Sequence, residues 1–256
     1  MENSTHYTKK EQEFAKIANS IVNQAKYGEY LTHFLNIREQ QIVNDFANKE
    51  NLFIISFGLL NNSEKKKMFL SRQSIDFNKI NWNISLLEIE YETKFNNIYH
   101  STILGSLINN GIKFQSIGDI FESDESRWQV IIETSIMPFV ISQIKKIGKT
   151  HVNIVQKNFD QIIQPKNDSK EITVMLPSLR LDVAIGEILK ISRSDAKTKI
   201  ENNDVKLNFF NFDNVSYALK RGDTISVKGH GRIIFLETIG NTNRNKVKAN
   251  FLKIGR

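Results

Sequence analysis

The sequence predicts an α+β protein, and three patterns along the chain support that fold class. Apolar residues recur at helical spacing in the first segment, and strands alternate with helices in the middle. A polar linker at 158–171 then precedes two helices and several short strands. At roughly 100 to 150 residues per folding unit, the chain is long enough for two or three domains. We predict a mostly helical domain at 1–80, a second domain at 81–157 and a third at 172–256.

The first domain is predicted to begin with two amphipathic helices. Their apolar side chains recur every three or four residues, at Phe14, Ile17, Ile21 and Val22 and again at Ile42, Val43 and Phe46. The run 52–58 is short, apolar and rich in β-forming residues, which favours a buried strand. A polar helix is predicted to follow over 64–70.

The middle domain is predicted to have the element order β-α-β-β-α-β. In its first strand, apolar residues alternate with Glu88, Glu90 and Glu92, which are therefore expected to face water. The later elements are predicted as a helix ending at Gly111, a hairpin over 117–132, a helix from Pro138 to Ile147 and a strand over 152–155. Ferredoxin-like and RNA-recognition-motif-like (RRM-like) domains share this order.

The third domain is predicted to open with two helices. Ser192 and Asp195 have the spacing of a capping box, in which Ser192 accepts an amide hydrogen bond and Asp195 reaches back. Arg193 and Lys197 lie four residues apart beside the positive N-terminus of the second helix, which predicts a phosphate-binding corner. Short strands are predicted at 205–207, 215–219, 224–227 and 233–236.

Composition excludes several classes of protein. The chain contains no Cys, so disulfide scaffolds, thiolate metal sites and cysteine nucleophiles are excluded. Its longest apolar run, 52–60, is about half the roughly 18 to 20 residues that span a bilayer. The N-terminus lacks the pattern of a secretory leader, and the His residues lack the spacing of metal ligands. We expect a cytoplasmic protein with no metal and no cofactor.

Positive charge is concentrated in the last third of the chain. Residues 171–256 hold 15 Lys+Arg and 9 Asp+Glu, a net charge of +6, whereas residues 1–170 hold 20 and 19, a net charge of +1. The stretch from Arg244 to Arg256 contains five cations and no acid. Such a field attracts polyphosphate backbones or an anionic membrane surface. A solvated surface without a partner is an equally good interpretation of the charge alone.

Four motifs in the third domain resemble the S4-type RNA-binding domain. They are Arg180-Leu181-Asp182, Ser192-Arg193-Ser194 with Ala196, Val205-Lys206-Leu207-Asn208, and Gly222-Asp223 followed by a strand to Val227. The resemblance implies that two helices and the turns after them form an L-shaped surface for structured RNA. The predicted RNA-binding residues are Arg180, Asp182, Ser192, Arg193, Ser194, Lys197, Lys206, Asn208 and Arg232, of which Asp182, Ser192 and Asn208 are expected to shape caps and turns.

Nearly the whole chain also resembles the YlmH family of Gram-positive bacteria. This resemblance rests on motifs at 30–40, 100–107, 111–112 and 117–120. It implies a role in ribosome-associated quality control, on stalled large ribosomal subunits that still carry peptidyl-tRNA, and in support of C-terminal alanine tailing. The implied partners are rRNA, tRNA and the large ribosomal subunit. We expect no small-molecule substrate, no membrane attachment and a monomeric protein.

Three patterns resemble catalytic motifs but lack what the chemistry requires. Gly148-Lys149-Thr150 resembles the end of a P-loop, yet it follows a helix and lacks the earlier Gly. Arg180-Leu181-Asp182 also resembles the catalytic triplet of pseudouridine synthases, but it starts a helix at the opening of the third domain. The three acids of the first middle-domain strand have no partner base or nucleophile. We therefore predict a binding protein and not an enzyme.

Some alternatives stay open at the level of sequence. Phe121 and Trp128 could stack on bases, as aromatic residues of RRM domains do, although core packing is the favoured interpretation of Phe121. An RNA-modifying enzyme with a catalytic centre in 1–157 is one alternative function. A peripheral cell-division factor that uses its basic C-terminal stretch at the membrane is another.

Overall fold

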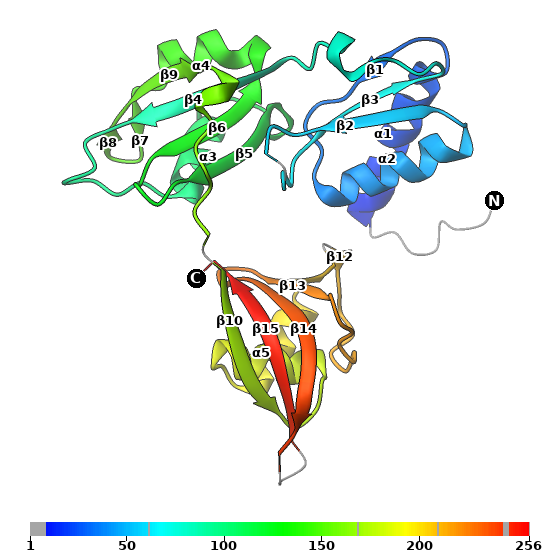
Figure 1. The fold of residues 1–256 in the computed structure, drawn as a ribbon, viewed down its shortest axis with the longest axis vertical. Coiled ribbons are helices and arrows are strands. Elements are labelled where there is room, and N and C mark those ends of the chain that lie inside the picture. Colours follow the sequence, from blue (N-terminus) through cyan, green and yellow to red (C-terminus); the bar gives the residue numbers. More distant parts are fainter. Residues whose placement is uncertain (1–8, 61, 168, 209, 243–245, 256) are drawn as a thin grey trace. The chain divides into compact units, whose positions relative to one another are not determined.

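The computed structural model describes residues 9–60, 62–167, 169–208, 210–242 and 246–255. The chain forms two compact units, Met1–Lys166 and Asn167–Arg256 (Figure 1). Both units contain helices and strands, so the predicted α+β class is confirmed. The predicted domains 1–80 and 81–157 both fall within the first unit, and 172–256 falls within the second.

The N-terminal subdomain (residues 9–71) packs two helices against a three-stranded sheet. The helices are α1 (Lys9–Ala25) and α2 (Ile37–Lys49), and the antiparallel strands are β1 (Tyr30–Leu31), β2 (Phe53–Phe57) and β3 (Lys67–Ser71), in the order β1-β3-β2. Apolar side chains at helical spacing form the buried faces of both helices, as predicted, except that Ile17 is 55% exposed. Helix α2 begins with a capping box between Asn36 and Glu39.

Strand β3 shows that the predicted helix over 64–70 was wrong. β3 lies between β1 and β2, and all of its residues are buried. Met68 and Leu70 pack with the helices, whereas Phe69 belongs to a second hydrophobic cluster. The run of Lys before these residues suggested an exposed helix, but the Lys67 ammonium is buried 3.1 Å from the Glu133 carboxylate. This contact joins residues distant in sequence, so local pattern could not predict it.

The middle subdomain (residues 84–157) has the predicted element order β-α-β-β-α-β. Its main elements are β4 (Ile84–Glu90), α3 (His100–Asn109), β5 (Ile117–Glu122), β6 (Trp128–Glu133), α4 (Met137–Gln143) and β9 (Asn153–Lys157). The strands form an antiparallel sheet in the order β5-β6-β4-β9. Short 3-10 helices occur at Phe77–Lys79, Phe114–Ser116, Thr134–Ile136 and Phe159–Gln161.

Helix α4 is shorter than predicted. It ends at Gln143, and the small strands β7 (Lys146–Ile147) and β8 (Thr150–His151) pair after it. Gly148 makes the turn between them with a φ of +59°, a conformation that glycine adopts readily. The Gly-Lys-Thr tripeptide is therefore a hairpin turn and lacks the strand-to-helix context of a phosphate-binding loop.

Both faces of the middle sheet are buried. Helices α3 and α4 cover one face, where Trp128 is 6% exposed. On the other face Leu86, Phe121 and Ile131 pack in a cluster that also contains Phe34 and Phe69 of the N-terminal subdomain. Core packing of Phe121 is thus confirmed, and base stacking by Phe121 or Trp128 is excluded in this fold. The two subdomains share a core, and the sheet surface that RRM domains use for RNA is covered.

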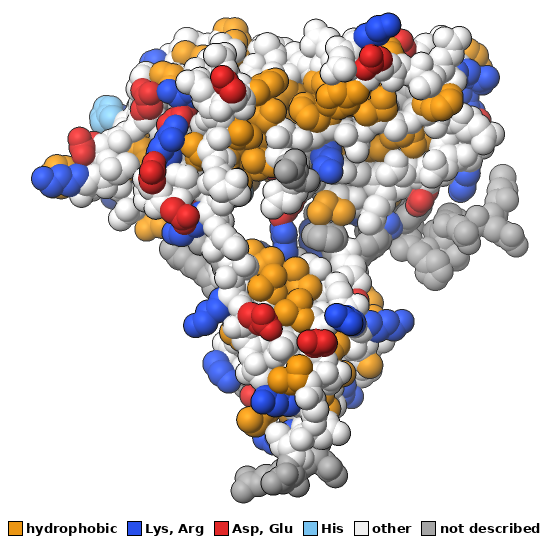
Figure 2. All heavy atoms as spheres, viewed as in Figure 1, with side chains coloured by type: hydrophobic (Ala, Val, Ile, Leu, Met, Phe, Trp, Pro, Cys, Tyr) orange, Lys and Arg blue, Asp and Glu red, His pale blue; other side chains and the backbone are white. Residues whose placement is uncertain are grey.

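The second unit packs helices α5 (Leu181–Leu189) and α6 (Arg193–Glu201) on a six-stranded antiparallel sheet (Figure 1). The strands are β10 (Ser169–Leu176), β11 (Val205–Leu207), β12 (Phe210–Asn211), β13 (Thr224–Val227), β14 (Gly231–Asn241) and β15 (Val247–Ile254), in the order β10-β15-β14-β13-β11-β12. The predicted strand over 215–219 is instead a turn with one isolated bridge between Arg180 and Ala218. Lys and Arg side chains are spread over the visible face of this unit (Figure 2).

The basic C-terminal stretch contains a core strand. β15 pairs with β10 on one side and β14 on the other, and Ala249 and Phe251 are fully buried. Ala249 and Phe251 alternate with Lys248 and Asn250, which is the pattern of a half-buried strand. The strand was not predicted, because the stretch was interpreted by its charge. Two of the five cations, Arg244 and Arg256, lie outside the described residues.

Candidate nucleic-acid interface

Two arginines meet on one buried carboxylate at the beginnings of α5 and α6. Arg180 is the N-cap residue of α5, and Arg193 is the first residue of α6. The Asp182 carboxylate accepts hydrogen bonds from Nε and Nη2 of Arg180 at 3.0 and 3.2 Å, and from Nε of Arg193 at 2.7 Å. Asp182 therefore pairs with two arginine side chains and does not form the helix cap or turn expected of it. Nothing in the local sequence indicated that Arg193 joins the same cluster.

The burial of this cluster is graded from inside to outside. The Asp182 side chain is 3% exposed, that of Arg180 is 37% exposed and that of Arg193 is 62% exposed. Burial alone would raise the pKa of Asp182, but the hydrogen bonds from Arg180 and Arg193 outweigh it and hold the pKa below its usual range. A guanidinium has five N–H donors, so each arginine keeps donors that Asp182 does not engage. The buried carboxylate therefore fixes two cations side by side at the surface.

The start of α6 is capped as predicted. The Ser192 hydroxyl accepts a hydrogen bond from the Asp195 amide at 3.0 Å and donates one to the Asp195 carboxylate at 2.7 Å. Asp195 thus bonds the side chain of Ser192 and not its backbone N–H. Ser194 is exposed in the first turn. The Lys197 side chain is 58% exposed and lies 3.6 Å from Glu201, a weak pair in solvent.

Lys206 and Arg232 lie on a different face from the two arginines. Lys206 alternates along β11 with the buried residues Val205 and Leu207, which face the helices. Lys206 therefore points away from the helices. Cross-strand pairing runs from Lys206 to Ser226 and on to Arg232, so the two cations share that outer face at about two strand spacings, roughly 10 Å. The structure brings the predicted cations together in two groups and not in one.

Asn208 shapes a turn. It has a φ of +50°, and its side chain donates a hydrogen bond to Asp223 and accepts one from the Thr224 amide, both at 2.8 Å. Asp223 in turn accepts from the Lys220 amide at 2.8 Å. These bonds satisfy the amide groups of Asn208, as expected for a residue that holds a turn.

The predicted exposure of the acidic strand was partly wrong. Glu88 is 7% exposed, and its carboxylate accepts two hydrogen bonds from Arg127 at 2.9 Å and one from Gln129 at 3.2 Å. The hydrogen bond from Arg127 is the main reason that the pKa of Glu88 is lowered. Gln129 also donates to the backbone oxygen of Gln161, which covers this part of the sheet. Glu88 is therefore a structural anion, whereas Glu90 at the strand end is exposed.

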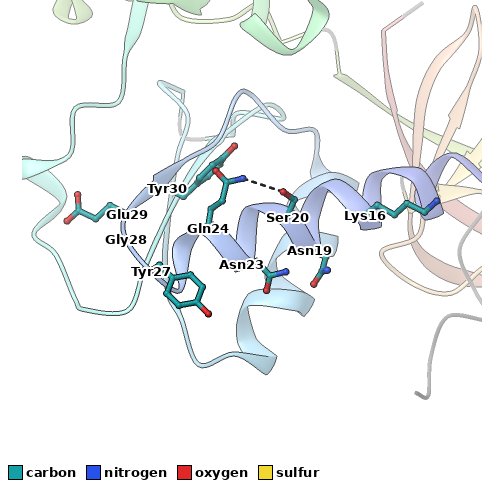
Figure 3. A pocket seen from close by; sticks show the side chains of 9 residues that line it. All are labelled: Lys16, Asn19, Ser20, Asn23, Gln24, Tyr27, Gly28, Glu29 and Tyr30. Atoms are coloured by element: carbon teal, nitrogen blue, oxygen red, sulfur yellow. Dashed lines mark hydrogen bonds between the residues drawn. The ribbon is translucent and has the colours of Figure 1, made fainter.

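An open hollow of about 650 Å³ lies beside the C-terminal half of α1 (Figure 3). Asn19, Asn23 and Gln24 project along it, and the Gln24 amide donates to the Ser20 hydroxyl at 3.3 Å. Tyr27, which is 92% exposed, lies at the helix end. These groups can form hydrogen bonds, but the hollow contains no nucleophile paired with a base.

The described part of the chain offers neither a metal site nor a membrane span. Within those ranges, no group of three or more His, Cys, Asp or Glu side chains is placed to hold a metal ion. None of the described helices combines the length and the apolar character needed to cross a bilayer.

Both the sequence and the fold of this chain are similar to those of known proteins. Residues 78–161 match the family model described as "Putative RNA-binding domain in YlmH". The chain is 28% identical over 228 residues to the Ribosome-associated protein quality control protein P2 of Bacillus subtilis (strain 168). The aligned region covers 89% of this chain and 88% of the relative. A solved structure named Cell division protein ylmH from Streptococcus pneumoniae superposes with a TM-score of 0.52 at 28% identity, covering 62% of this chain and 98% of that one. The three matches confirm the resemblance to the YlmH proteins that the sequence motifs indicated.

Proposed function

We propose that this protein binds rRNA and tRNA on stalled large ribosomal subunits and acts there, without catalysis, in ribosome-associated quality control. The names of the matched family model and of the Bacillus subtilis relative support RNA binding and association with the ribosome. A role in alanine tailing, a monomeric state and a cytoplasmic location belong to the same proposal.

The observation that carries the proposal is the arginine pair of Arg180 and Arg193. Both guanidiniums are held by Asp182, which is buried, and both are partly exposed at the starts of two helices. Helix N-termini favour anions, and a fixed guanidinium matches the geometry of a phosphate oxygen pair. Phosphodiester groups of structured RNA fit this surface.

The same cluster argues against catalysis of the pseudouridine-synthase type. Such a role for Arg180-Leu181-Asp182 would need an accessible carboxylate. Both oxygens of Asp182 accept hydrogen bonds from arginines, and the side chain is 3% exposed. Asp182 is placed to position cations and not to attack a base.

A role in cell division is a second candidate, favoured by the name of the Streptococcus pneumoniae relative. A factor acting at the membrane surface would bind anionic vesicles through its cations. Flotation of the full chain with vesicles of phosphatidylglycerol would detect this. Flotation that is lost in Arg193→Ala would favour the membrane over RNA as the partner of the arginine pair.

A salt titration of RNA binding by the full chain tests the main proposal. Arg193→Ala should weaken binding to purified rRNA about tenfold and reduce the slope of log K against log salt by about 0.7 to 0.9, the loss of one phosphate contact. Arg221→Ala removes the same charge from a side chain that is 80% exposed elsewhere in the unit, and it should change binding less than threefold. Equal effects of the two variants, or no affinity of the wild type at low salt, would refute the proposal.

A further inference from the structure

A groove in the second unit lies between the edge strand β10 and the C-terminal turn of α5. It has a volume of about 470 Å³ and is open to solvent. Its lining is mixed: Ile172, Val174, Met175 and Ile188 contribute apolar surface beside polar groups, and Met175 is 54% exposed. Lys170, Lys190 and Lys253 line the same groove, with Glu187 as the only acid among its lining residues.

The three lysines form a concentration of positive charge that the fold does not neutralise. Lys170 on β10 lies directly opposite Lys253 on β15 in the strand register. Like charges placed opposite each other across strands are destabilising. Neither lysine forms an ion pair with a carboxylate among the residues that the structure describes. Lys190 reaches Glu187 only at 4.0 Å, with side chains 80% and 45% exposed, so this pair contributes little.

Lys190 itself occupies an unfavourable backbone conformation. It ends α5 with a φ of +57°, in the left-handed region where Gly or Asn is preferred at a helix end. A lysine at this position therefore places a cation at the groove at a small cost in backbone energy. Three elements, β10, β15 and the end of α5, each contribute one lysine to the same hollow.

We propose that this groove is a second RNA site, which binds the phosphodiester backbone of a single-stranded segment. A mixed lining of cations and apolar side chains matches a nucleotide strand, because the phosphates are anionic while the sugars and base faces are apolar. A concave groove accommodates a strand but not a flat bilayer. The groove and Arg180 lie at opposite ends of α5, ten residues or about 15 Å apart along the helix, so one RNA molecule can reach both.

This inference rests on the proposed function, since it adds a second contact to the same RNA-binding unit. The test uses the full chain and two probes, a fluorescently labelled single-stranded oligoribonucleotide and a stable RNA hairpin. Lys170→Gln combined with Lys253→Gln should weaken single-strand binding about tenfold and lower the salt slope by about 1.4, two single-strand phosphate contacts. Hairpin binding should fall less than threefold.

Lys220→Gln combined with Lys228→Gln is the matched control. It removes the same charge from turns on either side of β13, away from the groove, and should change single-strand binding less than threefold. Lysine acetylation followed by mass spectrometry gives a second readout. The single strand should protect Lys170, Lys190 and Lys253 from acetylation, and leave Lys220 and Lys228 unprotected.

The outcomes separate the two proposals. If the wild type binds neither RNA, the proposed function and this inference both fail. If Arg193→Ala weakens binding while the groove variant matches its control and no groove lysine is protected, only this inference is overturned. If the groove variant loses binding to poly-glutamate or to phosphatidylglycerol vesicles but keeps its affinity for the single strand, the groove serves an acidic protein or a membrane, and the inference is overturned as well.

Discussion

The two units each contain a nearly buried carboxylate that engages two basic side chains, and they use it differently. In the second unit, Asp182 holds Arg180 and Arg193, whose side chains are 37% and 62% exposed. In the first unit, Glu133 lies 3.1 Å from the ammonium of Lys67, which is 2% exposed, and 2.9 Å from the His33 ring. The carboxylates are similarly buried and the His33 side chain is 63% exposed, so the enclosure of Lys67 makes the difference.

This difference in exposure indicates two roles for a buried carboxylate. Glu133 holds two subdomains together, whereas Asp182 positions two arginines at the surface. The ammonium of Lys67 is enclosed, with the Glu133 carboxylate and the Phe34 ring beside it. Glu133 ends β6 of the middle sheet, and Lys67 begins β3 of the N-terminal sheet, so the pair ties the two subdomains together. The Ser116 hydroxyl satisfies the second oxygen of Glu133 at 3.0 Å. Asp182, in contrast, leaves guanidinium donors available to an external anion.

The largest effect is expected from breaking the enclosed pair. Lys67→Met leaves the Glu133 carboxylate buried without its main counter-charge, which should destabilise the first unit by about 3 to 5 kcal/mol. Urea unfolding followed by tryptophan fluorescence measures this unit alone, because both Trp residues, Trp82 and Trp128, lie in it. Lys66→Met is the matched control and should cost less than about 1 kcal/mol. A loss below that value for Lys67→Met would mean that the pair does not fasten the subdomains.

A smaller but more discriminating effect is expected at Asp182. Asp182→Asn raises the net charge by one, so charge alone predicts tighter RNA binding. If the carboxylate positions the arginines, affinity should instead fall about threefold to tenfold, with a loss of about 1 to 3 kcal/mol in the stability of the second unit. Asp204→Asn makes the same charge change beside Lys228, and should leave affinity unchanged or slightly raised. Fluorescence anisotropy with labelled rRNA fragments measures the RNA affinity of both variants. Tighter binding by Asp182→Asn would refute the idea that this carboxylate positions the two arginines.

Local sequence patterns correctly predicted the helices, the hairpin and the helix cap that depend on residues close together in the sequence. Helical spacing located α1 and α2, β-rich runs located the β5-β6 hairpin, and the Ser192 cap was placed correctly. The failures depend on distant contacts. The helix predicted over 64–70 is a strand because it pairs with β1 and β2, and a stretch described as basic is a central strand because β10 and β14 flank it.

In the candidate site, too, local features could be predicted from the sequence and distant contacts could not. The cations at the helix starts could be predicted from the motifs around them, since capping and spacing are local properties. The bond between Arg193 and Asp182 joins two helices, and the Lys170–Lys253 pair joins two strands more than eighty residues apart in sequence. Neither contact has a local signature. The sequence therefore predicted which residues are basic, and the fold determined which of them act together.

A third cluster, at Lys65, is intermediate between the two carboxylate clusters and gives the smallest expected effect. The Lys65 ammonium donates to the backbone oxygen of Ile117 at 2.8 Å and lies 3.5 Å from the centre of the Phe114 ring, while its amide donates to Asp119 at 3.1 Å. Burial lowers its pKa to about 8, although the charges of Asp119 and Glu39 oppose the shift. The first unit thus favours the neutral form of this amine more than the unfolded chain does.

The sign of the resulting pH dependence follows from proton binding. Below about pH 8 the amine is charged in both states and the folded state bears the full cost of burying the charge. Between about pH 8 and the unfolded pKa of 10.5, the unfolded chain binds more protons, so stability should rise with pH. Because the group is partly exposed, the gain should be about 1 kcal/mol between pH 7 and pH 9.5. Urea unfolding by tryptophan fluorescence should show this gain in the wild type and in Lys66→Met but not in Lys65→Met. An unchanged gain in Lys65→Met would show that this ammonium, like the exposed arginines of the second unit, is solvated rather than enclosed.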